Sequence, residues 1–524
     1  GVRFIHIVLR MIFRYYTPSL RKYPTKTAEK YKIFCRGGMR NIDIFRANCY
    51  DRRARKNVTN FAFGESRMKA LDLGSPRVLP TVLKLVIPAM IAQFINVLYS
   101  IVDRMYVGNI ADIGDTALAA VGVCAPITTL ISSFAFLIGT GGAPLFAMAL
   151  GEGREDNSKR ILTNALYSLV ALALVVTALV FALERPLLMT FGASETTYAY
   201  AKQYLLIYAA GAVFSITATG LNQYITAQGY SGMGMLTTVI GAAANIALDP
   251  LFIFVFRMDV AGAALATVLS QFLSFAFVVT FLLWKNTKIR IALGKCDFKL
   301  IGKIVRLGIS PFLIMATDSV IIIVSNAILQ ARGGLEGDLW ITVSTVVQAF
   351  FQLITMPMMG ISTGSQPVIS YNYGAKNTAL IKKAEKYIVG LCLLFTAAMT
   401  VVSLFAAGPF VSLFTSNAEI AERSVWGIRV FMLGVIPLSF QYAFVDGLTA
   451  LGQPQYAITL SLTRKLVVFL GCLIVLPVFW GAQAVFYAEP AADVFSAILS
   501  TAVFLIVFPK ILKKREAAPP APQQ

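Results

Sequence analysis

Long apolar stretches dominate the pattern of hydrophobic and polar positions from about residue 79 to residue 507. Each stretch reaches about 20 residues, the length that an α-helix needs to cross the hydrocarbon core of a bilayer. Backbone polar groups inside lipid need internal partners, so such stretches predict helices. The pattern predicts an all-α integral membrane protein with twelve spans, at 80–108, 117–149, 161–183, 200–227, 235–256, 260–284, 304–331, 339–371, 384–407, 424–450, 456–479 and 482–509.

Composition supports a chain that is solvated by lipid. Hydrophobic residues make up 57% of the 524 residues and charged residues only 14%, and the mean hydropathy is +0.71. A chain of this length and apolarity exceeds what one soluble core can bury. We therefore expect membrane lipids as its surroundings.

The net charge of +20 is concentrated at the N-terminus, where residues 1–67 hold 16 Lys and Arg against 4 Asp and Glu. The membrane body is only mildly basic, so we expect no nucleic-acid partner. Residues 1–67 could form a basic arm on anionic lipid or a non-core extension, and we favour the extension. Removing this extension should leave the activity of the membrane body intact.

Basic residues in the body gather on one side of the predicted membrane. Cytoplasmic loops of membrane proteins carry an excess of Lys and Arg, so both termini should be cytoplasmic. Residues 285–303 are predicted to be a cytoplasmic linker and residues 513–524 a disordered tail. The basic residues that set this orientation are Lys285, Lys288, Arg290, Lys295, Lys299, Lys303, Arg306, Lys510, Lys513, Lys514 and Arg515.

An internal repeat relates the two halves of the body, residues 68–284 and 304–512. A constant offset of 223 residues pairs Thr140 with Thr363, Gly141 with Gly364, Pro144 with Pro367, Gly151 with Gly374, Phe191 with Phe414, Gly211 with Gly434 and the TAxG run at 226–229 with that at 449–452. Six spans per half give parallel repeats, related by a pseudo-two-fold axis along the membrane normal. Transporters of this design bind substrate between their two bundles.

Ionisable residues inside predicted spans are costly and point to function. Asn245 and Asp249 lie four residues apart on one helical face, and Pro250 follows them. Asp103 and Thr267 are predicted at a similar depth in the same half. Carboxylate, amide and hydroxyl oxygens suit Na⁺, and a buried carboxylate can carry a proton. Alternatively, Asp103 could pair with Arg104 at the membrane surface and Asn245 could only join helices.

The C-terminal half carries candidate substrate-binding residues. Glu489 and Asp493 share one helical face and could bind a cationic substrate together with Asp318, or could lie at the outer water boundary. Arg464 is expected to pair with Asp446 or with another carboxylate. An adaptable surface in the eighth span could line a cavity or pack against helices; its members are Gln348, Phe351, Met356 and Met359.

Enzyme chemistry has little support in the sequence. The only histidine is His6, and the cysteines, at positions 35, 49, 124, 296, 392 and 472, have no paired spacing. A His-ligated metal site or a Ser-His-Asp triad in the membrane body is therefore excluded, and no Walker loop indicates ATP. We expect no cofactor, and a membrane-embedded enzyme is the weaker alternative.

The chain resembles the multidrug and toxic compound extrusion (MATE) family of cation-coupled antiporters, over about residues 72–512. The resemblance rests on 84–88 (KLVIP), on Val102-Asp103 with Val107-Gly108, on 245–250 (NIALDP) and on the six-plus-six repeat. One departure is Gln228 before Gly229, where many members carry Arg or Glu.

The resemblance implies a cation site at Asp103, Asn245, Asp249 and Thr267. It also implies export of bulky, often cationic amphipathic molecules in exchange for Na⁺ or H⁺, across a bacterial plasma membrane and as a monomer. A flippase for lipid-linked or polysaccharide precursors is the alternative within the same twelve-helix plan, and it should show a cationic central cavity.

Overall fold

The computed structural model describes residues 70–517 except 112, 286, 293 and 416. The predicted extension 1–67 and residues 518–524 of the predicted tail therefore lie outside the described residues. Helices of the N-terminal half are α5 (Val78–Gly108), α6 (Gly114–Gly151), α7 (Glu155–Thr190), α8 (Glu195–Ala210), α9 (Ala212–Ala227), α10 (Ser231–Pro250), the π-helical η3 (Leu251–Val255) and α11 (Asp259–Leu283).

The C-terminal half is also built from helices. They are α12 (Phe298–Gly333), η4 (Gly334–Glu336), α13 (Gly337–Gly374), α14 (Thr378–Val411), α15 (Ala418–Ala450), α16 (Pro454–Leu462), the π-helical η5 (Thr463–Phe469), α17 (Leu470–Trp480), η6 (Ala482–Ala484) and α18 (Val485–Ala517). Residues 513–517, which the sequence analysis assigns to a disordered tail, are the last helical residues of α18.

The prediction of twelve spans in an all-α membrane fold is confirmed. Eleven helices of the described region are long and apolar enough to cross a membrane, and the pair α8 and α9 makes up to twelve if it counts as one span. This pair bends by 52° at Gly211, where a β-carbon would lie 2.5 Å from Val268 of α11. The absence of a side chain at Gly211 allows α11 to pack closely against the bend.

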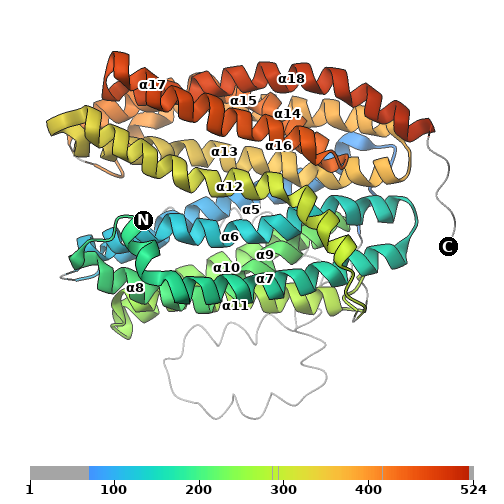
Figure 1. Ribbon diagram of the computed structural model, residues 1–524, viewed down its shortest axis with the longest axis horizontal. Coiled ribbons are helices and arrows are strands. Elements are labelled where there is room, and N and C mark those ends of the chain that lie inside the picture. The colour runs from blue at the N-terminus through green and yellow to red at the C-terminus, as the bar shows by residue number, and fades with distance from the viewer. Residues whose placement is uncertain (1–69, 112, 286, 293, 416, 518–524) are drawn as a thin grey trace, which may run out of the picture. The chain divides into compact units, whose positions relative to one another are not determined.

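Helix pairing is the same in the two halves, as the repeat predicts. In the N-terminal half α6 packs on α7 and α9, and α11 packs on α8, α9 and α10. In the C-terminal half α13 packs on α14 and α15, and α18 packs on α15 and α17. The halves meet through the equivalent pairs α6 with α12 and α13 with α5, near the middle of the layered helices in Figure 1.

Large apolar side chains remain exposed on the outward faces of several helices. Val255 is 67% exposed, Leu394 68% and Phe405 77%. A soluble protein seldom leaves such apolar surface in contact with water. These faces are suited to contact with lipid chains.

The segment between α11 and α12 is held against the N-terminal half. Thr163 of α7 donates a hydrogen bond to the carbonyl of Ala292, 2.7 Å away. Gln228, the residue that departs from the family pattern, accepts one from the N–H of Ile289 at 2.8 Å. Asp297 caps α12 by accepting hydrogen bonds from the N–H groups of Leu300 and Lys299. These bonds, with Arg160 nearby, hold the pKa of Asp297 below its usual value.

We call the end of the helix bundle that carries this segment the linker end. It also carries the connection between α6 and α7 and the C-terminal end of α18, which lies at the right in Figure 1. The other end is called the far end.

Candidate functional site

Three of the four predicted cation-site residues contact one another in the N-terminal half. Asn245 donates from Nδ2 to Oδ1 of Asp249 at 3.1 Å, and to Oγ1 of Thr267 on α11 at 3.4 Å. Asp103 of α5 interacts electrostatically with Asp249. Asp249 is fully buried, and Asn245 is 2% exposed. The structure therefore brings together the four residues that the sequence analysis groups.

Oxygen atoms in this cluster lack partners. Oδ1 of Asp103, Oδ1 of Asn245 and Oδ2 of Asp249 are buried, and none of them accepts a hydrogen bond from a described residue. No ion pair within the described region joins Asp103 to Arg104. A buried acceptor without a partner is costly. These oxygen atoms can coordinate a small cation or bind a proton, either of which would be the missing partner.

The polypeptide geometry beside Asp249 is also unusual. Pro250 ends the α-helical part of the fifth span, and the chain continues as the π-helical turn η3. Proline has no N–H to donate to the preceding turn, and π-helical turns occur frequently at functional sites. The other π-helical segment among the described residues, η5, lies in the equivalent eleventh span and contains Arg464.

Tyrosines around the acidic pair were missed by the sequence analysis. Tyr99 lies one turn before Asp103 and interacts electrostatically with both Asp103 and Asp249. Tyr204 of α8 interacts with Asp103 as well, and its ring stacks on that of Tyr208. The spacing of Tyr99 from Asp103, four residues on one helical face, is the signal that could have revealed the first of them.

A cavity of about 440 Å³ opens beside these residues. Asn245 and Thr267 line it, together with Tyr99 and Tyr208. Part of its lining comes from the C-terminal half, through Gln352, Met356 and Met359 of α13 and Met315 of α12. Two of the four cation-site residues, Asn245 and Thr267, therefore line a cavity that both halves share, whereas Asp103 and Asp249 do not line it.

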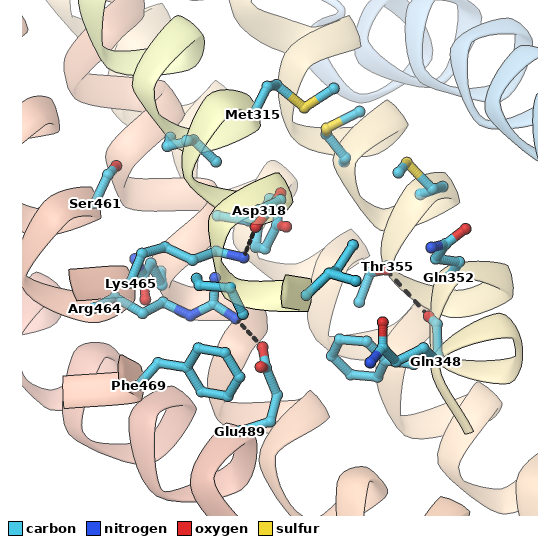
Figure 2. Close-up of a pocket in the computed structure, with 18 of the residues that line it drawn as sticks. Met315, Asp318, Gln348, Gln352, Thr355, Ser461, Arg464, Lys465, Phe469 and Glu489 are labelled. Atoms are coloured by element: carbon cyan, nitrogen blue, oxygen red, sulfur yellow. Dashed lines mark hydrogen bonds and ion pairs between the residues drawn. The ribbon is translucent and has the colours of Figure 1, made fainter. Parts of the chain in front are cut away.

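A second cavity, of about 240 Å³, lies mainly in the C-terminal half. Figure 2 shows Arg464, Lys465 and Glu489 facing Gln348 and Gln352 across it. Met356 and Met359 line both cavities, so the two adjoin. Eight of the nine residues that the sequence analysis places in a substrate cavity line it: Asp318, Gln348, Phe351, Met356, Met359, Asp446, Arg464 and Glu489.

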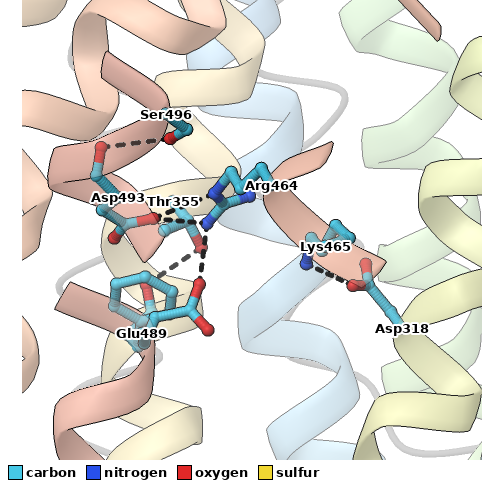
Figure 3. Close-up of polar contacts among 8 residues, drawn as sticks. Asp318, Thr355, Arg464, Lys465, Glu489, Asp493 and Ser496 are labelled. Atoms are coloured by element: carbon cyan, nitrogen blue, oxygen red, sulfur yellow. Dashed lines mark hydrogen bonds and ion pairs between the residues drawn. The ribbon is translucent and has the colours of Figure 1, made fainter. Parts of the chain in front are cut away.

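The ninth residue, Asp493, lies behind this cavity and does not line it. It is fully buried, and its Oδ1 accepts hydrogen bonds from Nε and Nη2 of Arg464 at 2.9 and 2.7 Å. Arg464 also donates to Glu489 at 2.7 Å. Figure 3 shows both carboxylates directed at the guanidinium group. The partners of Arg464 are therefore Asp493 and Glu489, and both carboxylates are buried.

Lys465 points to the other side of its helix and pairs with Asp318 of α12. Both bases on this side of the cavity are thus neutralised by carboxylates. Asp446 does not pair with Arg464; its Oδ2 accepts a hydrogen bond from Ser362 at 2.5 Å.

The two halves are in close contact at the linker end. Arg515 of α18 donates to Oε1 of Glu152 at 2.6 Å, which joins the C-terminal end of the chain to the end of α6. A β-carbon at Gly151 would overlap the carbonyl oxygen of Tyr371, and one at Gly374 would overlap that of Met148. This repeat-related glycine pair allows the backbones of the two halves to touch, which closes this end.

Gly151→Ala is expected to separate the halves at the linker end. Overpacking of this kind costs about 1–3 kcal/mol, which shifts the ratio of closed to open molecules by roughly five- to hundredfold. Spin labels at exposed Glu155 and Ala375, in a variant without native cysteines, should report a longer distance. Gly302→Ala is the matched control, because nothing lies within 4 Å of its added β-carbon; equal distances in the two variants would contradict the closure.

Comparisons with known proteins agree with this architecture. A family model described as MatE matches residues 88–251 and 315–474. The multidrug export protein MepA of Staphylococcus haemolyticus is 26% identical over 425 residues, covering 80% of this chain and 91% of that protein. MepA of Staphylococcus aureus is 24% identical over 429 residues, covering 80% and 92%.

Solved structures share the fold. A crystal structure of MATE in complex with MaL6 superposes with a TM-score of 0.80 at 22% identity, over 85% of this chain and 99% of that one. A MOP superfamily transporter from Pyrococcus furiosus, described as having a binding pocket of reverse polarity, superposes with a TM-score of 0.79 at 22% identity, over 84% and 98%.

Proposed function

The chain belongs to the MatE family, and we propose that it is a secondary active exporter of amphipathic, often cationic small molecules, driven by entry of Na⁺ or H⁺. The relatives named above are transporters, and MepA is described as a multidrug export protein. With bacterial MepA relatives, the multi-pass body is suited to a bacterial plasma membrane. We infer both termini to be cytoplasmic from the basic residues at the linker end.

The observation that carries this proposal is the set of buried, unpartnered oxygens of Asp103, Asn245 and Asp249. A cation that reaches them supplies the missing partner. The bound cation also changes the charge beside the cavity that both halves share. Because a ligand shifts a conformational equilibrium only through unequal affinity for the two states, these residues must be arranged differently when the linker end is open.

The substrate is expected in the C-terminal cavity. Phe351, Met356 and Met359 offer adaptable apolar contact, and Asp446 adds a carboxyl group that forms no ion pair with a base of the described chain. The two bases that line it are paired with carboxylates. A flippase for pyrophosphate-linked lipids needs free positive charge here, so the flippase alternative is not favoured.

Exchange of cation for substrate across the membrane follows if the two ligands favour opposite conformations, one with the linker end closed and one with it open. The structure has the contacts that hold the linker end closed, namely the Arg515 and Glu152 ion pair and the packing of Gly151 and Gly374. Binding of a cation at Asp249 then favours the state in which these contacts break. Substrate enters from the cytoplasm in that state and is carried outward when the contacts re-form.

Vesicles that contain the purified protein test this proposal. A fluorescent lipophilic cation is loaded, and Na⁺ and pH gradients are imposed one at a time. At least one of the two gradients should drive dye movement against its own concentration gradient. Movement that neither gradient changes would contradict coupled export, and movement that needs ATP would point to another class of transporter.

A further inference from the structure

A carboxyl group that the account above does not use is buried in the C-terminal half, near the linker end. Glu385 lies two turns into α14 and is 5% exposed. Neither of its carboxyl oxygens has a hydrogen-bond partner in the described part of the chain. It lies on the helix face formed by Ile381, Ala384 and Ile388, which belong to a buried apolar cluster. An ionised carboxylate without a partner in such surroundings is strongly disfavoured.

The repeat shows that this carboxyl group is not required by the fold. The offset of 223 residues pairs Glu385 with Leu162 of α7 and Asp446 with Gln223 of α9. Leu162 is fully buried at the equivalent position. The N-terminal half therefore builds the same helix contact with an apolar and a neutral residue, whereas the C-terminal half places two acids there.

Space for the Glu385 carboxyl group is provided by α15. A β-carbon at Gly447 would lie 2.9 Å from Oε1 and 3.0 Å from Oε2 of Glu385. The next residue along α15 towards its start is Asp446, whose charge acts on Glu385. Cys392, one further buried group of α14, interacts electrostatically with both acids. No base of the described chain forms an ion pair with Glu385 or Asp446.

Asp446 connects this acid pair to the substrate cavity. It lines the C-terminal cavity, whereas Glu385 does not. Ser362 of α13 donates to its Oδ2 at 2.5 Å, which stabilises the ionised form of Asp446. The pair thus consists of an inner carboxyl group in apolar surroundings and an outer carboxylate that contacts the cavity.

We propose that Glu385 and Asp446 form a second proton site, in the C-terminal half, which exchanges its proton with the substrate cavity through Asp446. Glu385 holds the proton on its carboxyl group. It passes the proton to the Asp446 carboxylate and becomes a carboxylate itself, and Asp446 then releases the proton to water in the cavity. The site lies toward the linker end, whereas Asp103 and Asp249 lie toward the far end, so the halves carry acid pairs at opposite depths.

Infrared difference spectroscopy of the purified full chain tests the site without depending on transport. The wild type should show a carbonyl stretch from the buried protonated Glu385 at neutral pH. Glu385→Gln should lose this band, whereas any band from the acids of the N-terminal half should remain in both proteins. Glu422→Gln is the control, because Glu422 is an exposed acid of α15 and its loss should leave the band in place. A band that persists unchanged in Glu385→Gln would overturn the proposal.

Two further variants separate the roles. Asp446→Asn should keep the band but slow its shift on transfer to D₂O, because the exchange route through the cavity is lost; an unchanged rate would overturn that route. Glu385→Leu restores the residue found in the N-terminal repeat, so it should fold and lack the band if Glu385→Gln is unstable. This inference rests on the proposed function, but its test is independent of transport. Failure of wild-type vesicles to transport the dye would contradict the exporter proposal, whereas only the infrared band tests the proton site.

Discussion

The Asp249→Asn variant is expected to lose cation-driven efflux while remaining folded in the membrane. Asparagine keeps the shape of the side chain but removes the charge at the centre of the N-terminal cluster. An interaction with a charged group contributes on the order of 1.5–3 kcal/mol. Loss of the Asp249 charge should therefore weaken cation binding by roughly ten- to hundredfold. Efflux of a lipophilic cation from whole cells, at equal protein level, measures the loss.

A matched control for this variant is Asp156→Asn on α7. The side chain of Asp156 is 94% exposed, and its ion-pair partner among the described residues is Lys159; exposed ion pairs contribute little. Its efflux should therefore equal that of the wild type. Normal efflux by Asp249→Asn would remove this residue from the mechanism.

Arg464→Ala is expected to be the most destabilising single change in the C-terminal half. It leaves the carboxylates of Glu489 and Asp493, both buried, without their cation. Removing one member of a buried ion pair costs about 3–5 kcal/mol. The thermal unfolding midpoint in detergent should fall clearly below that of the wild type.

A compensated variant distinguishes the charge from the packing. Arg464→Met combined with Glu489→Gln and Asp493→Asn removes all three charges and keeps most of the volume. It should recover most of the lost midpoint, because replacing a buried ion pair by neutral groups is often nearly neutral in stability. An Arg464→Ala protein as stable as the wild type would show that the network does not hold the twelfth span in place.

The fold could be predicted closely from hydropathy, because each span must satisfy its backbone hydrogen bonds internally. The twelve predicted spans and the repeat both correspond to the observed helices and their pairing. The bend at Gly211 and its close packing against Val268 of α11 could not be predicted, since the partner lies on a different helix. Hydropathy along one segment carries no information about such a contact.

The N-terminal site was predictable for a similar reason. Asn245 and Asp249 are joined by helical periodicity alone, and Asp103 stands out as an acid in an apolar span. Glu385 was missed because Lys382, Lys383 and Lys386 surround it and make that stretch resemble a solvated helix end. In the structure these lysines are exposed and Glu385 faces inward. Its spacing of four residues from Ile381 was the available signal.

Partners of the C-terminal charges were only partly accessible from the sequence. Arg464 was expected to pair with a carboxylate, and the predicted spans of the C-terminal half place several carboxylates at a similar depth in the membrane. The choice of Asp493 and Glu489 depends on how the η5 turn rotates Arg464 towards α18, while Lys465 next to it is directed towards α12. A one-residue change of helical phase, which a π-helical turn provides, decides which base meets which acid.

Release of the bound cation by substrate is the most direct test of exchange through the N-terminal acids. A bulky lipophilic cation such as tetraphenylphosphonium is added to purified protein in weakly buffered detergent, and released H⁺ and Na⁺ are measured together. Because coupling between two ligands is reciprocal, the wild type should release H⁺ or Na⁺ as the lipophilic cation binds. Asp249→Asn should release clearly less, because the cation that the wild type holds at Asp249 is missing. Binding of the lipophilic cation without any release, or equal release from both proteins, would contradict the account.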